Sequence, residues 1–485
     1  MPCLHWITRR KSLVAAALLG PATLTPLSTW AQQATPVAPR ATQTAESTAR
    51  CNLTAAQDLV PTLVKVVYEV DGKLLSAPET AQGRPREHVM RGIANFLYEE
   101  RFTDIANRQV VRYYDEAKAD ISASGRASEV RLRDDRRYVA IDPQQAGRSL
   151  RSLGGPLTRS ELELIELPGG SSWVDQLLPG REASVGEKWS HDEQLLGRLF
   201  NLDAVTANDL KTELVSVTAD AAQLSMAGSV VGSVSGVVTE LKVQGKLTFN
   251  RQLQRITWLA LGLQEERSVG LGSPGLQATS RLRMLIDAGA VPHLDPQLVA
   301  AMTPSTMAGA DLLEYRTNDG TLTFPHDRRW HLHSDQGGLI VLRRIEDGRV
   351  IAQCNLKPLL QLAPGQTLSL EQFQTEVRTA LGTALQQVVE AKEEKLPSGV
   401  RQLRISVIGQ VANAPVHWVY YQLSDAEGHQ ATCVFTMSGE DATRFGGEDV
   451  TLVSGIRFAS DLDQSDQPAV PEEVAQSTDD SDAVR

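Results

Sequence analysis

The segment from Leu368 to Lys395, LSLEQFQTEVRTALGTALQQVVEAKEEK, decides how we interpret the second half of the chain. Ser369, with Gln372 three residues later, forms an S-x-x-Q capping box, which predicts the start of a helix. Apolar residues then recur at three- and four-residue steps, at Leu370, Phe373, Val377, Leu381, Ala384, Leu385 and Val388. The pattern predicts one long amphipathic helix over the whole segment, ended by Pro397.

Strand-like alternation flanks the predicted helix on both sides, from Trp330 to Leu356 and from Arg401 to Phe458. A helix with one apolar face must bury that face, and the flanking strands offer a sheet on which to do so. Residues 322–460 are therefore predicted to form an antiparallel sheet covered by one long helix.

Residues 55–287 also contain short alternating segments, which are clearest between Thr212 and Ile286. Polar and glycine turns such as Gln244-Gly245 separate them. Regular spacing of this kind is typical of an antiparallel meander, and one apolar face favours a curved sheet. We predict a curved antiparallel half-barrel here, so the expected fold class of the chain is α+β.

The chain begins with the pattern of an export signal. Arg9, Arg10 and Lys11 precede an uncharged run, and Thr29-Trp30-Ala31 places small residues at the cleavage positions. Residues 1–31 are therefore predicted to be a signal peptide, by either the general or the twin-arginine route. The protein is then exported to the periplasm or the extracellular side and associated with the cell envelope, with no transmembrane helix after signal removal.

Three further segments have compositions that favour no packed core. Residues 32–54 are predicted to be a disordered linker, and residues 288–321 an interdomain linker. Residues 461–485 carry eight acidic side chains against Arg485 alone, which predicts a disordered acidic tail. The formal net charge of −11 disfavours a nucleic-acid partner.

The cysteines gain meaning from the predicted export, because disulfides persist outside the cytoplasm. Removal of the signal leaves Cys51, Cys354 and Cys433. Cys354 and Cys433 alternate with apolar neighbours, so both point to the apolar face of a strand in the same predicted domain. Two alternatives stay open: a disulfide between Cys354 and Cys433, or two buried free thiols.

The order of elements in residues 322–460, an early meander opened around Trp330, one long helix and a late meander, resembles the PsbP-like α/β/α sandwich. That family consists mostly of exported accessory or binding modules, so the resemblance implies a non-catalytic role and transfers no functional residue. Residues 55–287 look like the curved half-barrel of periplasmic lipoprotein carriers, whose concave face holds lipid chains. Both resemblances concern architecture.

One pair of side chains has the chemistry of a metal site. His331 and His333 lie two residues apart on a predicted strand, so both rings face one side, with His326, Asp327 and Asp335 near in sequence. The alternative is a solvated strand face, because no motif fixes a third ligand.

The sequence contains no G-x-S-x-G, H-E-x-x-H, P-loop or C-x-x-C motif. We therefore expect a non-catalytic binding or accessory protein without a cofactor. Its expected partner is a lipid or other apolar ligand on the concave face of the first sheet, or an envelope protein. The alternative is a hydrolase or metal-dependent enzyme with a site between the domains, which requires converging His, Asp, Glu or Ser side chains.

Overall fold

The structure, a computed structural model, describes residues 49–57, 60–76, 84–144, 150–270, 274–289, 291–301, 309, 311–317 and 319–458. The predicted signal peptide and acidic tail lie outside the described residues, as does most of the predicted linker 32–54. None of the described helices is long and apolar enough to cross a membrane.

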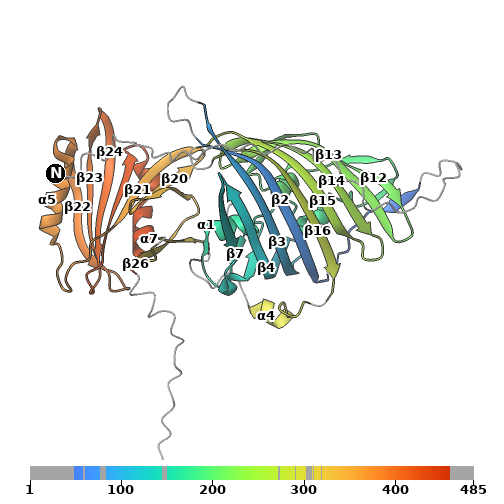
Figure 1. The fold of residues 1–485 in the computed structure, drawn as a ribbon, viewed down its shortest axis with the longest axis horizontal. Coiled ribbons are helices and arrows are strands. Elements are labelled where there is room, and N and C mark those ends of the chain that lie inside the picture. Colours follow the sequence, from blue (N-terminus) through green and yellow to red (C-terminus); the bar gives the residue numbers. More distant parts are fainter. Residues whose placement is uncertain are drawn as a thin grey trace, which may run out of the picture.

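The largest element is a 13-stranded antiparallel sheet, which curves strongly in Figure 1. Along the sheet its main path runs β10 (Lys188–Ser190), β12 (Lys211–Val217), β13 (Ala221–Val234), β14 (Val237–Asn250), β15 (Arg255–Arg267), β16 (Gly275–Ala288), β2 (Thr62–Ser76), β3 (Arg86–Asp104), β4 (Gln109–Ala123), β6 (Tyr138–Ile141) and β7 (Leu150–Ser152). Two strands lie off this path: β11 (Ala204–Asn208) pairs with β13, and β5 (Arg126–Arg131) pairs with β4. In chain order β2 and β16 are the first and last long strands of this sheet, and they pair with each other.

The chain itself covers the inner face of this sheet. The covering segment contains α1 (Arg159–Ile165), α2 (Ser171–Val174), the short 3₁₀ turn η2 (Asp175–Leu177) and α3 (Glu193–Phe200). Leu162, Val174 and Leu199 from these helices are buried in one apolar cluster with Val66 and Leu259 of the sheet. Burial of this apolar surface is the main force that holds the helices in place. Apolar side chains of the covering segment therefore pack on the concave face, and the lipid expected there stays a prediction.

A second, seven-stranded antiparallel sheet contains the later strands. Its order is β19 (Trp330–Gln336), β20 (Leu339–Glu346), β21 (Arg349–Leu359), β25 (Gln430–Ser438), β24 (Ala414–Ser424), β23 (Arg401–Val411) and β22 (Leu385–Lys395). Helix α5 (Leu370–Leu381) buries Phe373 and Val377 on one face. On the other face lie α6 (Ala442–Phe445) and α7 (Glu448–Ser454), and α7 stands between the two large sheets in Figure 1.

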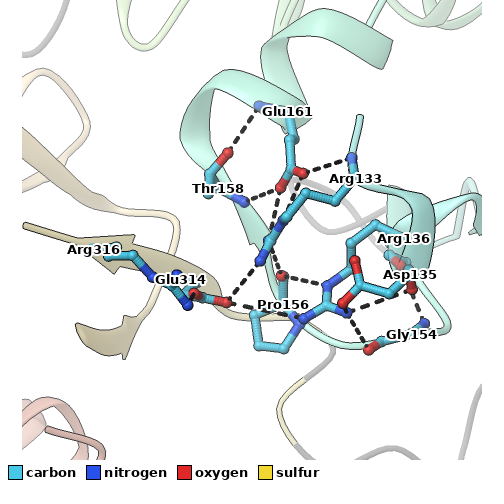
Figure 2. A network of polar contacts seen from close by, with 10 residues as sticks. Arg133, Asp135, Arg136, Gly154, Pro156, Thr158, Glu161, Glu314 and Arg316 are labelled. Carbon is cyan, nitrogen blue, oxygen red and sulfur yellow. Dashed lines mark hydrogen bonds and ion pairs between the residues drawn. The ribbon is translucent and has the colours of Figure 1, made fainter. Parts of the chain in front are cut away.

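A four-stranded sheet joins the two halves, in the order β26 (Arg457–Phe458), β18 (Leu322–His326), β17 (Leu313–Arg316) and β8 (Leu157–Thr158). Beside it, the Glu161 carboxylate at the start of α1 accepts hydrogen bonds from Arg133 Nε at 2.8 Å and from Arg133 Nη2 at 2.9 Å (Figure 2). The third guanidinium nitrogen of Arg133 donates to Glu314 of β17 at 3.3 Å. Thr158 caps α1 and donates its own N–H to Glu161, a complete capping box. One arginine thus connects α1 of the first half to β17 of the joining sheet.

The predicted long helix is wrong beyond Leu381. The capping box of Ser369 and Gln372 is confirmed, and the helix begins at Leu370 as expected. Gly382 then adopts a φ of 49°, a conformation that favours glycine and ends the helix. The residues that follow form β22, where β23 supplies hydrogen-bond partners along the edge of the sheet. Pairing with a neighbouring strand outweighs the local helical pattern.

The predicted α+β fold class is also wrong. The described residues are mostly β, arranged in several sheets with short helices, and no long helix covers the second sheet. Structure also occupies the described parts of two predicted linkers. Strand β1 (Arg50–Asn52) pairs with β9 (Glu182–Ser184), and α4 (Pro296–Ala301) and β17 lie between residues 288 and 321.

Replacing Ser369 by alanine is expected to lower the free energy of unfolding by about 1 kcal/mol, because its side chain accepts the Gln372 N–H at the start of α5. Urea denaturation followed by circular dichroism measures the change. Thr375→Ala in the same helix is the control: its hydroxyl only donates back to the Glu371 carbonyl, so stability should change little. Equal losses in both variants would contradict the capping role.

Candidate ligand cleft and polar core

A cluster of buried polar side chains lies under the inner face of the first sheet. Arg112 of β4 donates from Nε to Glu100 Oε2 of β3 at 2.8 Å, and from Nη2 to Ser171 Oγ at 3.1 Å. Ser171 begins α2 and donates to the same Glu100 oxygen at 2.7 Å. The hydroxyls of Tyr98 and Tyr114 complete the cluster, 2.9 Å from Ser171 Oγ and 3.2 Å from Arg112 Nη1. Alternation along β3 turns Tyr98 and Glu100 inward together.

Burial sets the charges in this cluster. It raises the pKa of the Tyr98 and Tyr114 hydroxyls, so both stay neutral at pH 7. Burial alone would lower the pKa of Arg112, but the neighbouring Tyr98, Tyr114 and Glu100 raise it well above its ordinary value. Arg112 is therefore a permanent buried cation. One carboxylate oxygen, Glu100 Oε1, has no hydrogen-bond partner among the described residues.

A second set of charges lies beside the first. Asp175 accepts the Ile256 N–H at 2.7 Å and lies 3.7 Å from Arg255 Nη2. Arg108 donates to the Ser172 carbonyl, and burial lowers the pKa of its guanidinium. The Nε atoms of Arg108 and Arg255 are both buried, and within the described part of the chain neither has a hydrogen-bond partner. With Arg112, three arginines face the two carboxylates of Glu100 and Asp175, so the polar core has one more cation than anion.

Two neighbouring clefts open above this polar core, with volumes of about 610 and 630 Å³. Trp173, Gln194 and Arg198 line both clefts, Arg112 reaches the first, and Arg108 reaches the second. The guanidinium carbons of Arg198 and Arg108 lie 4.9 and 5.7 Å from the Trp173 ring, within cation–π range. Neither arginine forms an ion pair with a described residue. The wall that the two clefts share therefore contains the Trp173 ring, Gln194 and the Arg198 cation, and Arg108 adds a second cation to the second cleft.

The cleft residues have little sequence signal of their own. Arg108 precedes β4, Trp173 lies in α2, and Arg198 lies in α3, so only the folded chain brings them together. Asp192 is the exception with a local pattern, because it caps α3 by accepting the N–H groups of Gln194 and Leu195. That cap fixes where Arg198 emerges, two turns later, but it does not indicate a binding site.

A β-bulge lies at the two predicted metal ligands. His331 pairs with Arg343, whereas the register of β19 with β20 shifts between Leu332 and Ser334, so His333 is the extra residue of the bulge. The metal site at His331 and His333 stays a prediction. His331 is half-buried, and His333 is exposed. Burial, then Arg159 and His326, lower the pKa of His331 to about 4, so the ring is neutral at pH 7. The nearby Arg159 cation disfavours a metal ion there.

Other His and carboxylate side chains converge instead. Among the described residues, Glu99, Asp115 and His293 form one group with ligand atoms within 4.8 Å of one another. Asp425, Glu427 and His429 form a second group in the loop between β24 and β25. Neither group contains His331 or His333.

Cys354 and Cys433 are buried free thiols on the neighbouring strands β21 and β25. Cys354 pairs with Phe435 and Cys433 with Leu356, so the two cysteines are diagonal neighbours. Burial and the adjacent Cys433 thiol raise the pKa of Cys354 well above its ordinary value. Diagonal positions are usually 7–8 Å apart, about the upper limit for a disulfide, so a bond here would require the strands to shift. The Cys354–Cys433 disulfide stays a prediction.

Two hydroxyl–histidine pairs bear on the enzyme alternative. Ser406 Oγ lies 2.8 Å from His417 Nε2, and Thr212 Oγ1 lies 2.8 Å from His191 Nε2. Ser406 and Thr212 are 4% and 0% exposed, so neither hydroxyl is open to a substrate in this conformation. A nucleophile must reach the reacting atom as well as its base. These pairs are better explained as satisfied polar groups within the sheets.

Comparison with known proteins gives partial fold similarity. No family model and no curated protein matches the sequence. The cyanobacterial PsbP (CyanoP) of Synechocystis sp. PCC 6803 is similar with a TM-score of 0.25 and 14% identity, over 32% of this chain and 99% of that one. Lipovitellin has a TM-score of 0.28 and 8% identity, over 49% of this chain and 26% of its own.

A Bacteroides thetaiotaomicron VPI-5482 protein has a TM-score of 0.23 and 8% identity, over 30% of this chain and 47% of its own. The chain therefore spans less than half the length of two of these three structures. The PsbP-like resemblance is confirmed only as a weak likeness of fold over about a third of the chain, and the lipoprotein-carrier resemblance stays a prediction. The comparisons assign the chain to no family.

Proposed function

We propose that this protein is an exported, non-catalytic binding protein, and that the clefts around Trp173 take a small polar ligand with a carboxylate or phosphate group. The observation that carries the proposal is the pair of guanidinium groups, Arg108 and Arg198, which lie 5.7 and 4.9 Å from the Trp173 ring and form no ion pair with a described residue. Arginine binds planar and phosphate anions in two-point contacts, and an aromatic ring packs against the flat face of a ligand. An acidic sugar ring has both features.

We place the ligand in the clefts rather than on the concave face. Helices α1 to α3 bury apolar side chains against that face, which supports a site elsewhere. The clefts lie at the surface of the covering segment, and Gln194 and Arg198 line both of them. The wall of the first cleft also includes Asn201 and the carboxylates of Glu166, Glu193 and Asp203. Such polar groups fix the orientation of a polar ligand, whereas an apolar ligand would leave them unsatisfied.

The predicted export supports where the protein acts and not which ligand it binds. It rests on the sequence pattern of residues 1–31, which lie outside the described residues. A binding protein in the cell envelope would meet sugar acids and phosphate esters there. The alternative partner is an envelope protein, and docking on such a protein would require no cleft residue.

Replacing Arg198 by glutamine is expected to weaken anion binding in the clefts at least tenfold, because a hydrogen bond to a charged group contributes about 1.5–3 kcal/mol. Isothermal titration with glucuronate and with inorganic phosphate measures this. Arg283→Gln is the matched control, since Arg283 is 62% exposed on the outer face and pairs with Glu69. Unchanged affinity in Arg198→Gln, or no binding of either probe by the unchanged protein, would contradict the proposed anion site.

A further inference from the structure

A second polar cluster lies on the outer face of the first sheet, opposite the polar core. Glu99 and Glu100 are neighbours on β3, so their side chains point to opposite faces. Glu99 accepts the His293 N–H at 2.9 Å through Oε2, and its Oε1 lies 2.8 Å from His293 Nδ1. Asp115 of β4 is the third member, with ligand atoms of all three residues within 4.8 Å of one another.

A β-bulge places Asp115 in this cluster. Tyr98 pairs with Tyr114 and Leu97 pairs with Glu116, so Asp115 is the extra residue of β4. A bulge of this kind redirects a side chain that regular alternation would place elsewhere. Its position opposite β3 brings the Asp115 carboxylate beside that of Glu99.

The charges of the cluster are unbalanced. Glu99 is 2% exposed and Asp115 is half-buried, so both carboxylates are partly removed from water. Asp115 has no hydrogen bond or ion pair with a described residue. Arg101, two residues along β3, donates to the Leu294 carbonyl and forms no ion pair with either acid. Two carboxylates placed this close together repel each other unless a cation or a proton compensates them.

We propose that Glu99, Asp115 and His293 bind one divalent transition-metal ion such as Zn²⁺. Two carboxylates and one imidazole are three protein ligands of the kinds that Zn²⁺ accepts, and they leave one position for water. The Tyr113 ring stacks on His293 with centroids 4.0 Å apart and 15° between planes, which holds the imidazole in place. The half-exposed side chain of His293 gives an ion a path from solvent. This site is separate from the cleft and does not depend on it.

The ion would connect distant parts of the chain. His293 belongs to the segment that leads into α4, whereas Glu99 and Asp115 belong to adjacent strands. Val291, Leu294 and Val299 of this segment already pack on the outer face of the sheet. The ligand atoms come from the segment before α4 and from strands β3 and β4, so the metal would lie where this segment meets the sheet.

The loop group Asp425, Glu427 and His429 is the matched internal comparison. It has the same ligand types, and Asp425 likewise accepts the His429 N–H at 2.8 Å and lies 2.6 Å from Nδ1. Its members come from a single turn, and Glu427 is exposed. We therefore place the metal on the sheet rather than in this loop.

The test uses residues 32–485, treated with a chelator and then titrated with ZnCl₂, and separately with CoCl₂ while its visible absorption is recorded. We expect one Zn²⁺ per chain. Asp115→Asn and His293→Gln should each weaken Zn²⁺ binding at least tenfold and remove the Co²⁺ absorption bands, and His429→Gln should change neither. Without metal, Asp115→Asn should melt no lower than the unchanged protein, because it removes a repulsive charge.

Three results would overturn the proposal. The first is a Zn²⁺ dissociation constant above about 0.1 mM, too weak for a built site. The second is retained affinity in both Asp115→Asn and His293→Gln. The third is loss of affinity in His429→Gln, which would move the site to the loop. If one sheet variant fails to fold, the other gives the result on its own.

Discussion

Replacing Arg112 by methionine is expected to lower the free energy of unfolding by about 3–5 kcal/mol, the usual cost of removing one partner from a buried charge pair. The Arg112 side chain is 7% exposed and that of Glu100 is 1% exposed, so the remaining carboxylate has no access to water. Glu100 Oε1 already lacks a hydrogen-bond partner, and the substitution would leave Ser171 as the remaining donor to Oε2. Urea denaturation without ligand measures the loss.

A second substitution separates lost charge from lost packing. Glu100→Gln in the Arg112→Met background removes the unpaired charge but keeps a carbonyl that accepts from Ser171. It should therefore recover a large part of the stability. Arg91→Met is the control, because Arg91 is 75% exposed and its ion pair with Asp71 contributes little. A loss below about 1 kcal/mol in Arg112→Met would mean that water reaches the polar core.

Replacing Glu161 by alanine is expected to lower the free energy of unfolding by about 3 kcal/mol, because it leaves the Arg133 guanidinium without its principal partner. Glu161 accepts from Arg133 N, Nε and Nη2 and from Thr158 N (Figure 2). Loss of these contacts removes the Glu161 half of the capping box of α1 and one side of the connection to Glu314, while the Thr158 hydroxyl still accepts the N–H of residue 161. Hydrogen exchange should therefore rise at Leu157 and Thr158 and along β17, and not in β22 or β23.

The effect should depend on pH in a defined direction. Burial raises the pKa of Glu161, but hydrogen bonds from Arg133 and Thr158 outweigh it and hold the pKa below its ordinary value. A carboxyl with a depressed pKa stabilises the fold above the unfolded value of about 4.3, and this stabilisation is lost as pH falls through the folded value. The difference between the unchanged protein and Glu161→Ala should therefore narrow below about pH 4.

Glu163→Gln is the matched control for this prediction. Glu163 lies in the same helix, but burial raises the pKa of its carboxyl, and no hydrogen bond connects it to Arg133. Its contribution has the opposite pH dependence, present at low pH and lost as pH rises. The variant should be as stable as the unchanged protein or more stable near pH 7. A common pH profile for both variants would contradict the role of the Arg133 contacts.

The sequence predicted local features better than distant pairing. The S-x-x-Q box at Ser369 is confirmed because both partners lie within one turn. The strand meanders of both halves correspond to observed antiparallel strands, but the predicted turn at Gln244-Gly245 is wrong, because both residues lie inside β14. Leu385 to Lys395 was assigned to the helix because its apolar residues continue the helical period. The edge of a sheet, formed by β23, determines its structure, and a single sequence does not show that edge.

The candidate sites were beyond sequence reasoning for the same reason. Glu99 and His293 are 194 residues apart, and their contact depends on how the segment before α4 returns to the outer face of the sheet. The pair that the sequence did suggest, His331 and His333, assumed regular alternation, and the structure has a bulge between Leu332 and Ser334.

The charged residues of β22 have a further consequence. An outermost strand exposes unpaired backbone N–H and C=O groups, which can template pairing with another chain. The strand carries charges of both signs along this margin, at Glu390, Lys392, Glu393, Glu394 and Lys395, and Lys392 bridges Glu390 and Glu394. A second copy would have to bury these charges in order to add a strand here. These lysines and glutamates, which also suit a solvated helix, thus disfavour aggregation by strand pairing at the β22 edge of the second sheet.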